Sequence, residues 1–342
     1  MKLSQLLRAI RPLSLVGPED VEIRGLAYHS QQVEAGFLFA AFRGLKHDGL
    51  DFVDEAVKRG AVAILSEASP PPHWPLAWIQ VSDARQALAL LAAEFYDHPS
   101  ASMKVIGITG TKGKTTITYL LESIIIKAGG RPAVIGTINY RGPGLIQEAG
   151  RTTPEAPEIQ QMLRTFLDHG ATHAILEVSS HSLSLNRVLG VNFDLVMFTN
   201  LSPEHLDFHP TMEDYFEAKR RLFFLNKKKR TAIVNQDDPW GKRLISELPM
   251  TTITFGLEAE ALIRASEFKL SERNTTMVIT FPGGEVEIET SLLGYHNIYN
   301  VLAAFAAGLA LNLDLSAIVE GIRAVKNIPG RLEKIENDLG FS

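Results

Sequence analysis

The sequence predicts an α/β protein, in which a small N-terminal α/β domain is followed by a central, mostly parallel sheet with an appended antiparallel hairpin. Three observations lead to this fold class. At 342 residues the chain has room for two or three domains of roughly 150 residues each. Short apolar runs alternate with helical patterns along most of its length. Between Thr251 and Leu292 this alternation gives way to a pattern typical of hairpin strands.

The composition excludes several classes of protein. Apolar residues make up 45% and charged residues 21% of the chain, which excludes disordered, collagen-like and coiled-coil proteins. The net charge is −5 and no long basic block occurs, so we expect no nucleic acid partner. The chain has no cysteine, so any metal must bind oxygen or nitrogen ligands. Neither a secretory signal nor a run of 18 apolar residues occurs, which predicts no membrane segment and a cytoplasmic location.

Residues 1–102 are predicted to form the small N-terminal domain. Its boundary lies at Asp97–Ser100, because the residue before Pro99 is disfavoured in the α region. The proline-rich run Ser69–Pro72 is a predicted loop. The predicted strands are Gly36–Phe42 and Ala61–Leu65, and the predicted helices are Phe52–Arg59 and Ala84–Tyr96.

Residues 103–328 are predicted to form the central domain. Its strand candidates are almost continuously apolar, as expected of parallel strands covered on both faces. They are Val105–Thr109, Ala133–Ile138, His173–Val178, Asp194–Thr199 and Thr231–Asn235. A hairpin is predicted at Met277–Phe281 and Glu285–Glu289, and two helices at Asn297–Leu311 and Leu315–Ala324. Residues 329–342 are too few to build a core, so we expect a linker or the stub of an absent C-terminal domain.

The strongest functional motif runs from Val105 to Thr116 and consists of a strand, a glycine-rich turn and the start of a helix. Such a turn points several backbone N–H groups at one anion, and the helix N-terminus adds positive charge. We expect Lys114, a surface-loop charge, to reach the β and γ phosphates of a nucleotide and Thr115 to bind Mg²⁺. Ile108 stands where the strict Walker pattern has glycine, so a plain glycine-rich turn is the alternative. The predicted phosphate-binding residues are Gly110, Thr111, Lys112, Gly113, Lys114, Thr115 and Thr116.

Glu177 ends an apolar strand at the sheet edge where open α/β folds bind ligands. A carboxylate at this position suits Mg²⁺, which prefers oxygen ligands. The alternative role of Glu177 is to cap the next helix.

Several further blocks resemble the Mur ligase family, whose members join an amino acid or peptide to a carboxylate with ATP. The blocks are GTKGKTT, Arg151–Pro154, Glu177–Leu183, Thr199–His209, Tyr215–Lys219 and Gly294–Asn300, together with Ser30–Phe42. The resemblance covers essentially the whole chain, and it ends where the third domain of the family begins. It implies an N-terminal uridine-nucleotide domain and a central P-loop ATPase-like domain.

The resemblance also implies a second Mg²⁺, which His205 and a carbamylated Lys219 would hold. With Lys114, these are the predicted catalytic residues, and the complete set of metal ligands is Thr115, Glu177, His205 and Lys219. Without the resemblance, His205 would be a structural or exposed histidine. Lys219 would belong to the solvated basic face that we expect Arg220, Arg221 and the run Lys227–Arg230 to form.

Further site residues follow from the resemblance alone. Asn297, Asn300 and Arg331 would contact ATP, although Asn297 could instead cap its helix and Arg331 could be an exposed linker charge. The residues that would bind the uridine-nucleotide substrate are Ser30, Thr152, Thr153, Ser179 and Arg187. Thr152 and Thr153 could alternatively form a turn and cap the helix that follows.

The branch of the family with the greatest resemblance adds the third residue of the peptidoglycan stem peptide. The implied reaction phosphorylates UDP-N-acetylmuramoyl-L-alanyl-D-glutamate with ATP, and an amine then attacks the acyl phosphate. The expected amine is that of meso-diaminopimelate, with L-lysine as the alternative. Two alternatives stay open, a non-catalytic module that binds UDP-muramoyl peptide or ATP, and a folylpolyglutamate synthetase. We expect a monomer, and we expect residues 1–342 alone to bind the uridine nucleotide without ligating it.

Overall fold

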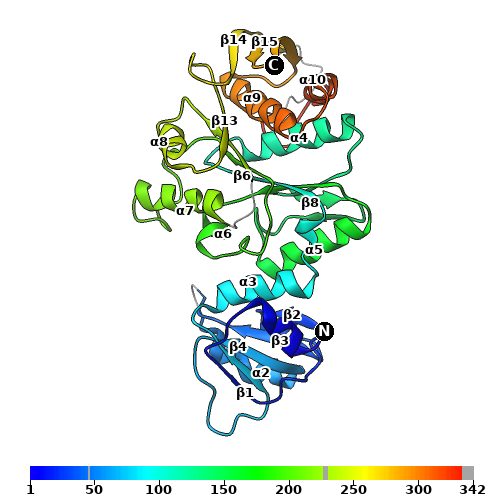
Figure 1. Ribbon diagram of the computed structural model, residues 1–342, viewed down its shortest axis with the longest axis vertical. Coiled ribbons are helices and arrows are strands. Elements are labelled where there is room, and N and C mark those ends of the chain that lie inside the picture. Colours follow the sequence, from blue (N-terminus) through cyan, green and yellow to red (C-terminus); the bar gives the residue numbers. More distant parts are fainter. Residues whose placement is uncertain (45–46, 226–229, 333–342) are drawn as a thin grey trace, which may run out of the picture. The chain divides into compact units, whose positions relative to one another are not determined.

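The computed structural model describes residues 1–44, 47–225 and 230–332, which form two compact units (Figure 1). The first unit comprises Met1–Pro99, Pro154–Arg164 and Ser184–Val191, and the second comprises the rest. The two short segments 154–164 and 184–191 thus pack with the N-terminal unit, although the sequence places them within 103–328. Of the predicted linker 329–342, residues 333–342 lie outside the described residues, as do Lys227–Lys229 of the predicted basic face.

The first unit contains a five-stranded sheet among its described residues, in the order β1-β5-β4-β3-β2. The strands β2 to β5 pair in parallel and β1 is antiparallel to β5. The strands are β1 Ser14–Val16, β2 Gly25–Ala27, β3 Phe37–Ala41, β4 Ala61–Ser66 and β5 Ala77–Gln80. The helices are α1 Leu3–Leu6, α2 Val53–Lys58 and α3 Ala84–Phe95, with 3₁₀ turns η1 Leu7–Ala9, η2 Ser30–Gln32, η3 Gly49–Phe52 and, at the unit boundary, η4 Pro99–Ala101.

Helix α3 begins where the Asp83 side chain accepts a hydrogen bond from the Gln86 N–H at 2.8 Å, which satisfies one of the free donors at the helix start. Its apolar face, which includes Leu88 and Leu91, packs on buried residues of β3 and β4. The predicted strands and helices of this domain are therefore confirmed to within a few residues.

The second unit is built on an eleven-stranded sheet of described residues, in the order β16-β15-β14-β13-β12-β11-β6-β10-β7-β8-β9. Its centre, from β14 to β7, is parallel, and both ends are antiparallel. The central strands are β6 Lys104–Thr109, β7 Pro132–Ile135, β10 His173–Glu177, β11 Leu195–Phe198, β12 Thr231–Asn235 and β13 Thr251–Gly256. The remaining strands are β8 Asn139–Gly142, β9 Leu145–Glu148, β14 Ile263–Leu270, β15 Thr275–Phe281 and β16 Gly284–Thr290. The predicted α/β class, with a mostly parallel sheet and the hairpin β15–β16, is confirmed.

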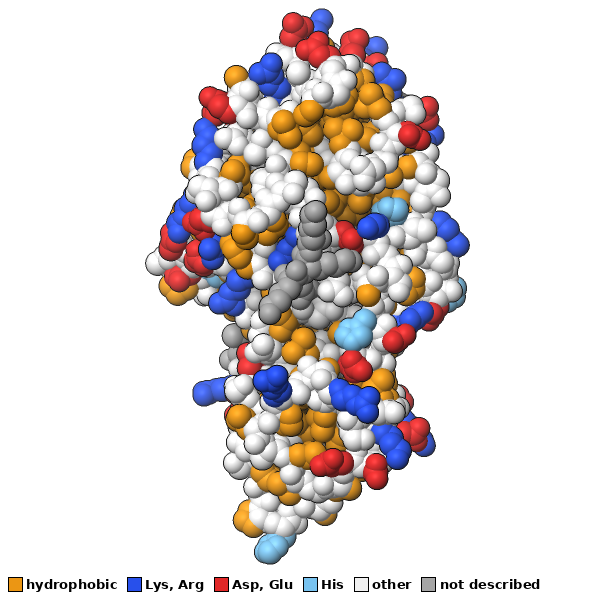
Figure 2. Space-filling model, viewed as in Figure 1, with side chains coloured by type: hydrophobic (Ala, Val, Ile, Leu, Met, Phe, Trp, Pro, Cys, Tyr) orange, Lys and Arg blue, Asp and Glu red, His pale blue; other side chains and the backbone are white. Residues whose placement is uncertain are grey.

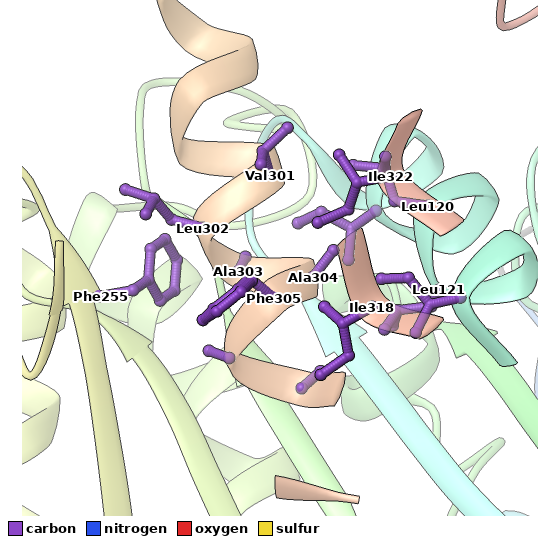
Figure 3. Packing of buried hydrophobic residues seen from close by; sticks show 14 of the residues in the cluster. Leu120, Leu121, Phe255, Val301, Leu302, Ala303, Ala304, Phe305, Ile318 and Ile322 are labelled. Carbon is purple, nitrogen blue, oxygen red and sulfur yellow. The ribbon is translucent and has the colours of Figure 1, made fainter. Parts of the chain in front are cut away.

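Helices cover both faces of this sheet. They are α4 Lys114–Lys127, α6 Ser180–Ser184, α7 Met212–Phe224, α8 Pro239–Glu247, α9 Tyr295–Ala310 and α10 Leu315–Ala324, and α5 Ala156–Asp168 continues from the first unit into the second. In Figure 1, α4, α9 and α10 lie together on one face and α7 lies on the other. Figure 3 shows α9 inserting Leu302 and Phe305 into the core beside Phe255, while Leu121 of α4 meets Ile318 of α10. This apolar layer fixes α4 and α9, which both reach the site described below.

The antiparallel hairpin β8–β9 is an element that the sequence analysis did not predict. Gly142 pairs with Leu145 across a two-residue turn formed by Pro143 and Gly144. Gly144 has φ +81°, a backbone conformation that glycine adopts readily. The Gly-Pro-Gly run is a turn signal that could have revealed the hairpin.

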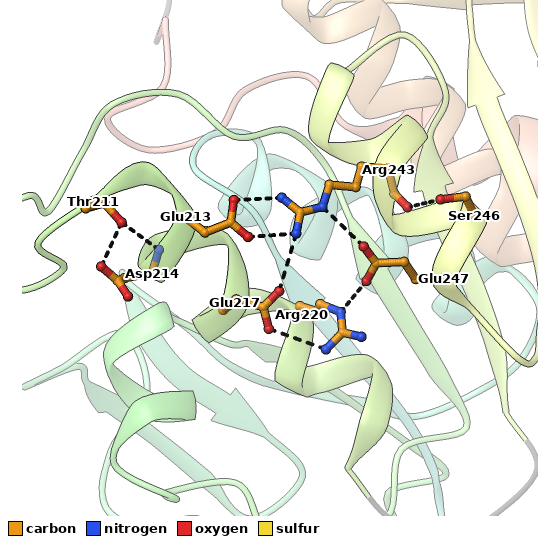
Figure 4. A network of polar contacts seen from close by, with 8 residues as sticks. All are labelled: Thr211, Glu213, Asp214, Glu217, Arg220, Arg243, Ser246 and Glu247. Carbon is orange, nitrogen blue, oxygen red and sulfur yellow. Dashed lines mark hydrogen bonds and ion pairs between the residues drawn. The ribbon is translucent and has the colours of Figure 1, made fainter.

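A network of ion pairs joins α7 to α8 (Figure 4). Arg243 of α8 pairs with Glu213 at 2.7 Å and with Glu247 at 3.1 Å, and Arg220 of α7 pairs with the same Glu247. The predicted solvated basic face is therefore wrong for Arg220, which is held in this network. It is also wrong for Arg230, which is buried and donates a hydrogen bond to the Leu222 carbonyl.

The surface carries charges of both signs. On the face drawn in Figure 2, basic and acidic side chains are interspersed, so the described residues of this face present a mixed-sign surface. Within the described part of the chain, no helix is long and apolar enough to cross a membrane.

Candidate functional site

A cavity of about 730 Å³ opens in the second unit at the carboxyl ends of the parallel strands. Open α/β sheets bind ligands at this edge, because loops from neighbouring strands meet there. The predicted site residues that line it are Thr111, Lys112, Gly113, Lys114, Thr115, Thr116, Thr152, Glu177, Ser179, His205, Asn297, Asn300 and Arg331. The structure therefore brings together residues that are up to 220 positions apart in sequence, from Thr111 to Arg331.

Two glycines give the loop after β6 its shape. Gly110 has φ +138° and Gly113 has φ +92°. A Cβ atom on Gly110 would lie 1.9 Å from the Thr199 hydroxyl oxygen, and one on Gly113 would lie 2.4 Å from the Asn300 side-chain oxygen. Both positions therefore require glycine for space as well as for backbone conformation.

Asn200, a residue to which the sequence analysis gave no role, holds the loop from the opposite side. Its carbonyl accepts the Thr111 N–H and its side-chain oxygen accepts the Lys112 N–H, both at 2.9 Å. The Thr199 hydroxyl also donates to the Lys112 carbonyl at 2.6 Å. These bonds fix the loop in front of the N-terminus of α4, where helical N–H groups favour an anion.

Lys114 is the first residue of α4, and it is half-buried rather than the surface-loop charge that the sequence suggests. Its Nζ donates to the carbonyls of Gly110 at 2.9 Å and Thr111 at 3.0 Å, so the ammonium is folded back on its own loop. Burial lowers the pKa of Lys114, although Glu177 and Glu204 oppose this shift.

Lys219, in the middle of α7, is only 1% exposed, so the alternative of a solvated basic face is wrong for it. Its Nζ donates to the Gly110 carbonyl at 2.9 Å and lies 4.5 Å from the centre of the Tyr215 ring. Lys114 and Lys219 thus share one carbonyl oxygen. Burial and the nearby Lys114 charge hold the pKa of Lys219 well below its ordinary value, which favours a neutral amine.

Glu177, at the end of β10, is 1% exposed, and its carboxylate meets two hydroxyl groups. It accepts hydrogen bonds from the Thr115 hydroxyl at 3.0 Å and from the Thr137 hydroxyl at 2.9 Å. The Thr137 N–H donates to its other oxygen at 3.0 Å. A carboxylate and a hydroxyl beside a phosphate-binding loop form an oxygen donor set that fits Mg²⁺.

His205 lines the cavity with a side chain that is 46% exposed, and its backbone has φ +57°. Its ring lies 4.9 Å from that of His181, centre to centre. The preceding Glu204 forms an ion pair of 2.6 Å with Lys112, which joins this loop to the phosphate loop. Burial alone would raise the pKa of Glu204, but Lys112 lowers it on balance.

His209 is a residue near this loop that the sequence analysis missed, although it follows His205 by four positions within the Thr199–His209 block. It is buried, its ring lies 5.1 Å from the Tyr215 ring, and its N–H donates to the His205 carbonyl at 2.9 Å. Burial, followed by the charges of His181 and Lys219, lowers the pKa of His209 to about 4. The backbone of His209 therefore supports the His205 turn, while its ring packs beside Tyr215.

In the described part of the chain, no group of three or more His, Cys, Asp or Glu side chains could hold a metal on its own.

On the far side of the cavity, Asn297 and Asn300 are both buried in the first turns of α9. Asn300 donates to the Asn297 side-chain oxygen at 2.8 Å, and Asn297 donates to the Leu293 carbonyl at 2.7 Å. The Arg331 guanidinium donates to the Thr115 hydroxyl at 3.4 Å. All three thus face the phosphate loop or its surroundings.

The predicted substrate residues fall in both units. In the second unit, the Thr153 hydroxyl donates to the Glu177 carbonyl at 2.7 Å and lies 3.3 Å from the Ser179 hydroxyl, while the hydroxyls of Thr152 and Thr137 lie 3.1 Å apart. In the first unit, Ser30 is buried and donates to Glu55 at 2.7 Å. Arg187, also in the first unit, pairs with Glu155 at 2.8 Å.

Comparison with protein families gives two matches along the chain. Residues 108–308, more than half of the chain, match the Mur ligase middle domain, and residues 22–96 match the catalytic domain of the Mur ligase family. The chain belongs to the Mur ligase family. The resemblance found in the sequence motifs is therefore confirmed.

Individual relatives agree with the family assignment. The UDP-N-acetylmuramoyl-L-alanyl-D-glutamate–2,6-diaminopimelate ligase of Geobacter metallireducens is 42% identical over 348 residues, which cover all of this chain and 68% of that protein. The ligase of the same name from Solibacter usitatus is 40% identical, and the match covers all of this chain and 70% of that protein.

Solved structures of Mur ligases share the fold. The structure of a UDP-N-acetylmuramoyl-L-alanyl-D-glutamate–2,6-diaminopimelate ligase superposes with a TM-score of 0.86 at 28% identity, over 99% of this chain and 69% of that one. MurF ligase from Thermotoga maritima in complex with ADP has a TM-score of 0.63 at 23% identity, over 94% of this chain and 70% of that one. At this lower identity the likeness concerns the fold alone.

Proposed function

We propose that this Mur ligase is an ATP-dependent amide ligase that adds meso-diaminopimelate to UDP-N-acetylmuramoyl-L-alanyl-D-glutamate in peptidoglycan synthesis. One observation supports it most. The phosphate loop and the Thr115–Glu177 pair line one cavity, in a chain that is 42% identical to a ligase named for this reaction. By the same proposal, residues 1–102 bind the uridine nucleotide, residues 103–328 bind ATP, and the ligase is a cytoplasmic monomer.

The phosphate loop would bind the β and γ phosphates of ATP. The N–H groups at the start of α4 point to this position, and Lys114 would exchange its two carbonyl partners for phosphate oxygens. Transfer of the γ-phosphoryl group to the substrate carboxylate forms an acyl phosphate, which the incoming amine attacks with release of phosphate. Positioning and charge neutralisation supply most of the catalysis in such a reaction. Asn297, Asn300 and Arg331 would complete the ATP site.

Two Mg²⁺ ions fit the proposal, one held by Thr115 and Glu177 and the other by His205 and a carbamylated Lys219. When bound, they would neutralise the charge that develops on the phosphoryl oxygens. The buried Thr115–Glu177 pair supports the first position. At the second position, a carbamate of Lys219 would supply an anionic oxygen, the kind of ligand that Mg²⁺ prefers.

Carbamylation of Lys219 is supported by its surroundings. Its lowered pKa favours the neutral amine, whose lone pair can attack carbon dioxide. The new N–C bond forms as one proton leaves the nitrogen, and the product is a carbamate anion.

The substrate side of the proposal rests on hydroxyl groups and one arginine. Thr152, Thr153 and Ser179 lie beside Glu177 in the second unit. Ser30 and Arg187 are their counterparts in the first unit. Hydroxyl donors with a guanidinium group suit a diphosphate.

The test is product analysis by mass spectrometry. The protein is given ATP, Mg²⁺ and UDP-N-acetylmuramoyl-L-alanyl-D-glutamate with either meso-diaminopimelate or L-lysine. A product with diaminopimelate supports the proposal. A product with L-lysine alone would show that L-lysine, and not diaminopimelate, is the amino acid that is added. Binding of the uridine nucleotide and ATP without any acyl phosphate or amide would agree with the expectation that residues 1–342 alone do not ligate, and it would leave the non-catalytic module as the alternative.

A further inference from the structure

A buried cluster of three charged side chains lies in the first unit, where two arginines converge on Glu155. Arg187 reaches the Glu155 carboxylate at 2.8 Å, and Arg85 of α3 reaches the other oxygen at 3.5 Å. The side chains of Glu155 and Arg187 are only 9% and 12% exposed. A charge-assisted bond between two such buried groups is stronger than the same bond in water.

The position of Glu155 is fixed by the start of α5. Its carbonyl accepts the Ile159 N–H at 3.1 Å, which is a helical bond, and its own N–H donates to the Glu158 carboxylate at 2.9 Å. The Tyr28 hydroxyl donates to the other oxygen of Glu158 at 2.9 Å. Glu155 therefore projects from a backbone that cannot shift without breaking several bonds.

The two arginines are fixed from the other side. The Arg85 guanidinium lies 4.1 Å from the centre of the Phe42 ring, a cation–π contact. The residue before Arg187, Asn186, has φ +55°, and its side chain donates to Asp83 at 3.2 Å. Asp83 caps α3, the helix that carries Arg85. The turn with Arg187 and the helix with Arg85 are thus joined independently of Glu155, and the Glu155 carboxylate in addition binds the Arg187 side chain directly.

We propose that Glu155 is a positioning residue that holds the Arg187 guanidinium in the orientation needed to bind the UDP-muramoyl substrate. This inference rests on the proposed function, in which Arg187 binds that substrate. A carboxylate oxygen bound to one terminal nitrogen of the guanidinium restricts the side chain, because it disfavours rotamers that the free side chain would otherwise occupy. Without the carboxylate, Arg85 and Arg187 would also repel each other.

The experiment compares the Glu155→Gln, Arg187→Gln and double variants by calorimetry with UDP-N-acetylmuramoyl-L-alanyl-D-glutamate. Glutamine keeps the shape of Glu155 and removes its charge. We expect each single variant to bind about tenfold or more weakly, as for loss of one charge-assisted hydrogen bond. Because Glu155 acts through Arg187, the double variant should bind as weakly as Arg187→Gln alone.

Two controls separate positioning from folding. Glu94→Gln removes a carboxylate of α3 that pairs with His98 outside this cluster, and it should leave the affinity unchanged. An ATP analogue, whose proposed site lies in the second unit, should bind all variants equally. Should Glu155→Gln not fold, Glu155→Asp keeps the charge but withdraws it from Arg187 and should weaken binding several-fold.

The inference is overturned if Glu155→Gln binds the substrate as the unchanged protein does. It is also overturned if the Glu155→Gln effect persists at full size in the Arg187→Gln background, or if binding of the ATP analogue falls in parallel. Failure of the unchanged protein to bind the uridine nucleotide would overturn the proposed function and the inference with it. If Arg187→Gln binds the substrate as tightly as the unchanged protein does, Arg187 does not bind the substrate, and Glu155 cannot act through it.

Discussion

The start of α4 and the middle of α7 each bring a lysine amino group to the carbonyl of Gly110, but the two lysines differ in almost every other respect. Lys114 lines the cavity and is half-buried, with a second carbonyl partner on Thr111. Lys219 is 1% exposed, does not line the cavity, and packs on the Tyr215 ring. Lys114 can thus meet a phosphate by a change of partners, whereas Lys219 can become a metal ligand only by a change of chemistry.

The largest effect should come from Lys114→Ala. We expect ATP-dependent turnover to fall by at least about 10² to 10³-fold, as when one preorganised donor is removed from a developing charge. The thermal unfolding temperature should change little, since the side chain is half-buried and its bonds go to the loop itself. Lys112→Ala is the matched control, because the Lys112 side chain is 67% exposed and pairs with Glu204, and this variant should lose far less turnover. Near-normal turnover of Lys114→Ala would show that the phosphate-loop assignment is mistaken.

Lys219→Ala should reduce turnover by about 10²-fold or more, through loss of the anion proposed at the second Mg²⁺. Unlike Lys114→Ala, this variant should recover part of its activity with added formate or acetate, which can restore an anion in the vacated space. Turnover with and without these carboxylates is the measurement. A shift in intact mass under mild conditions would report the carbamate itself. If formate or acetate restored the turnover of Lys114→Ala and Lys219→Ala equally, or of neither, the proposed difference in role between the two lysines would be wrong.

A smaller effect concerns stability and pH. The pKa of Lys219 is lowered in the folded state, so between this lowered value and 10.5 the unfolded chain binds one more proton than the folded chain. Stability should therefore rise with pH across this window, by up to about 1.4 kcal/mol per pH unit, and stay level above 10.5. Lys219→Met should lack this rise. Urea unfolding of both proteins in buffer free of carbon dioxide measures the difference, and parallel curves would contradict it.

The smallest effect should come from Arg243→Gln. This side chain holds α8 to α7 through surface ion pairs and is 41% exposed, so its loss should cost less than about 1 kcal/mol of unfolding free energy. Lys219 should keep its place, because α7 also buries Tyr215 and Phe223 in the core. Turnover and thermal unfolding of this variant therefore show whether the packing or the surface network positions Lys219. A loss of turnover comparable to that of Lys219→Ala would favour the network.

Sequence patterns predicted those features that depend on neighbouring residues. One local motif contains Gly110, Gly113 and Lys114, and an apolar run identifies the strand that ends at Glu177. The sequence therefore predicted that these residues lie at the edge of the sheet where the cavity is found. The role of Lys219 came only from the family resemblance, since helical spacing alone suggests a basic face. Its carbamylation stays a prediction.

The features that the sequence did not predict depend on long-range packing. Lys219 donates to the Gly110 carbonyl from 109 positions further along the chain, and Asn200 binds Lys112 from 88 positions further along. Arg230 looked solvent-exposed because its neighbours in sequence are basic, but the fold buries it against the Leu222 carbonyl. Periodicity describes each segment by itself, so it gives no information about which segments meet.

The close approach of Gly113 to Asn300 has a consequence for the order of folding. The two residues are 187 positions apart, and the Asn300 oxygen occupies the space beside the glycine. Contacts over such a separation require a large loop to close first, which makes them slow to form. We therefore expect the phosphate loop, although its motif is the most local in the chain, to reach its final conformation late, after α9 has docked on the sheet. During synthesis, while residue 300 is still inside the ribosome, the chain would therefore contain the whole phosphate-loop motif, but the loop would not yet have its final conformation.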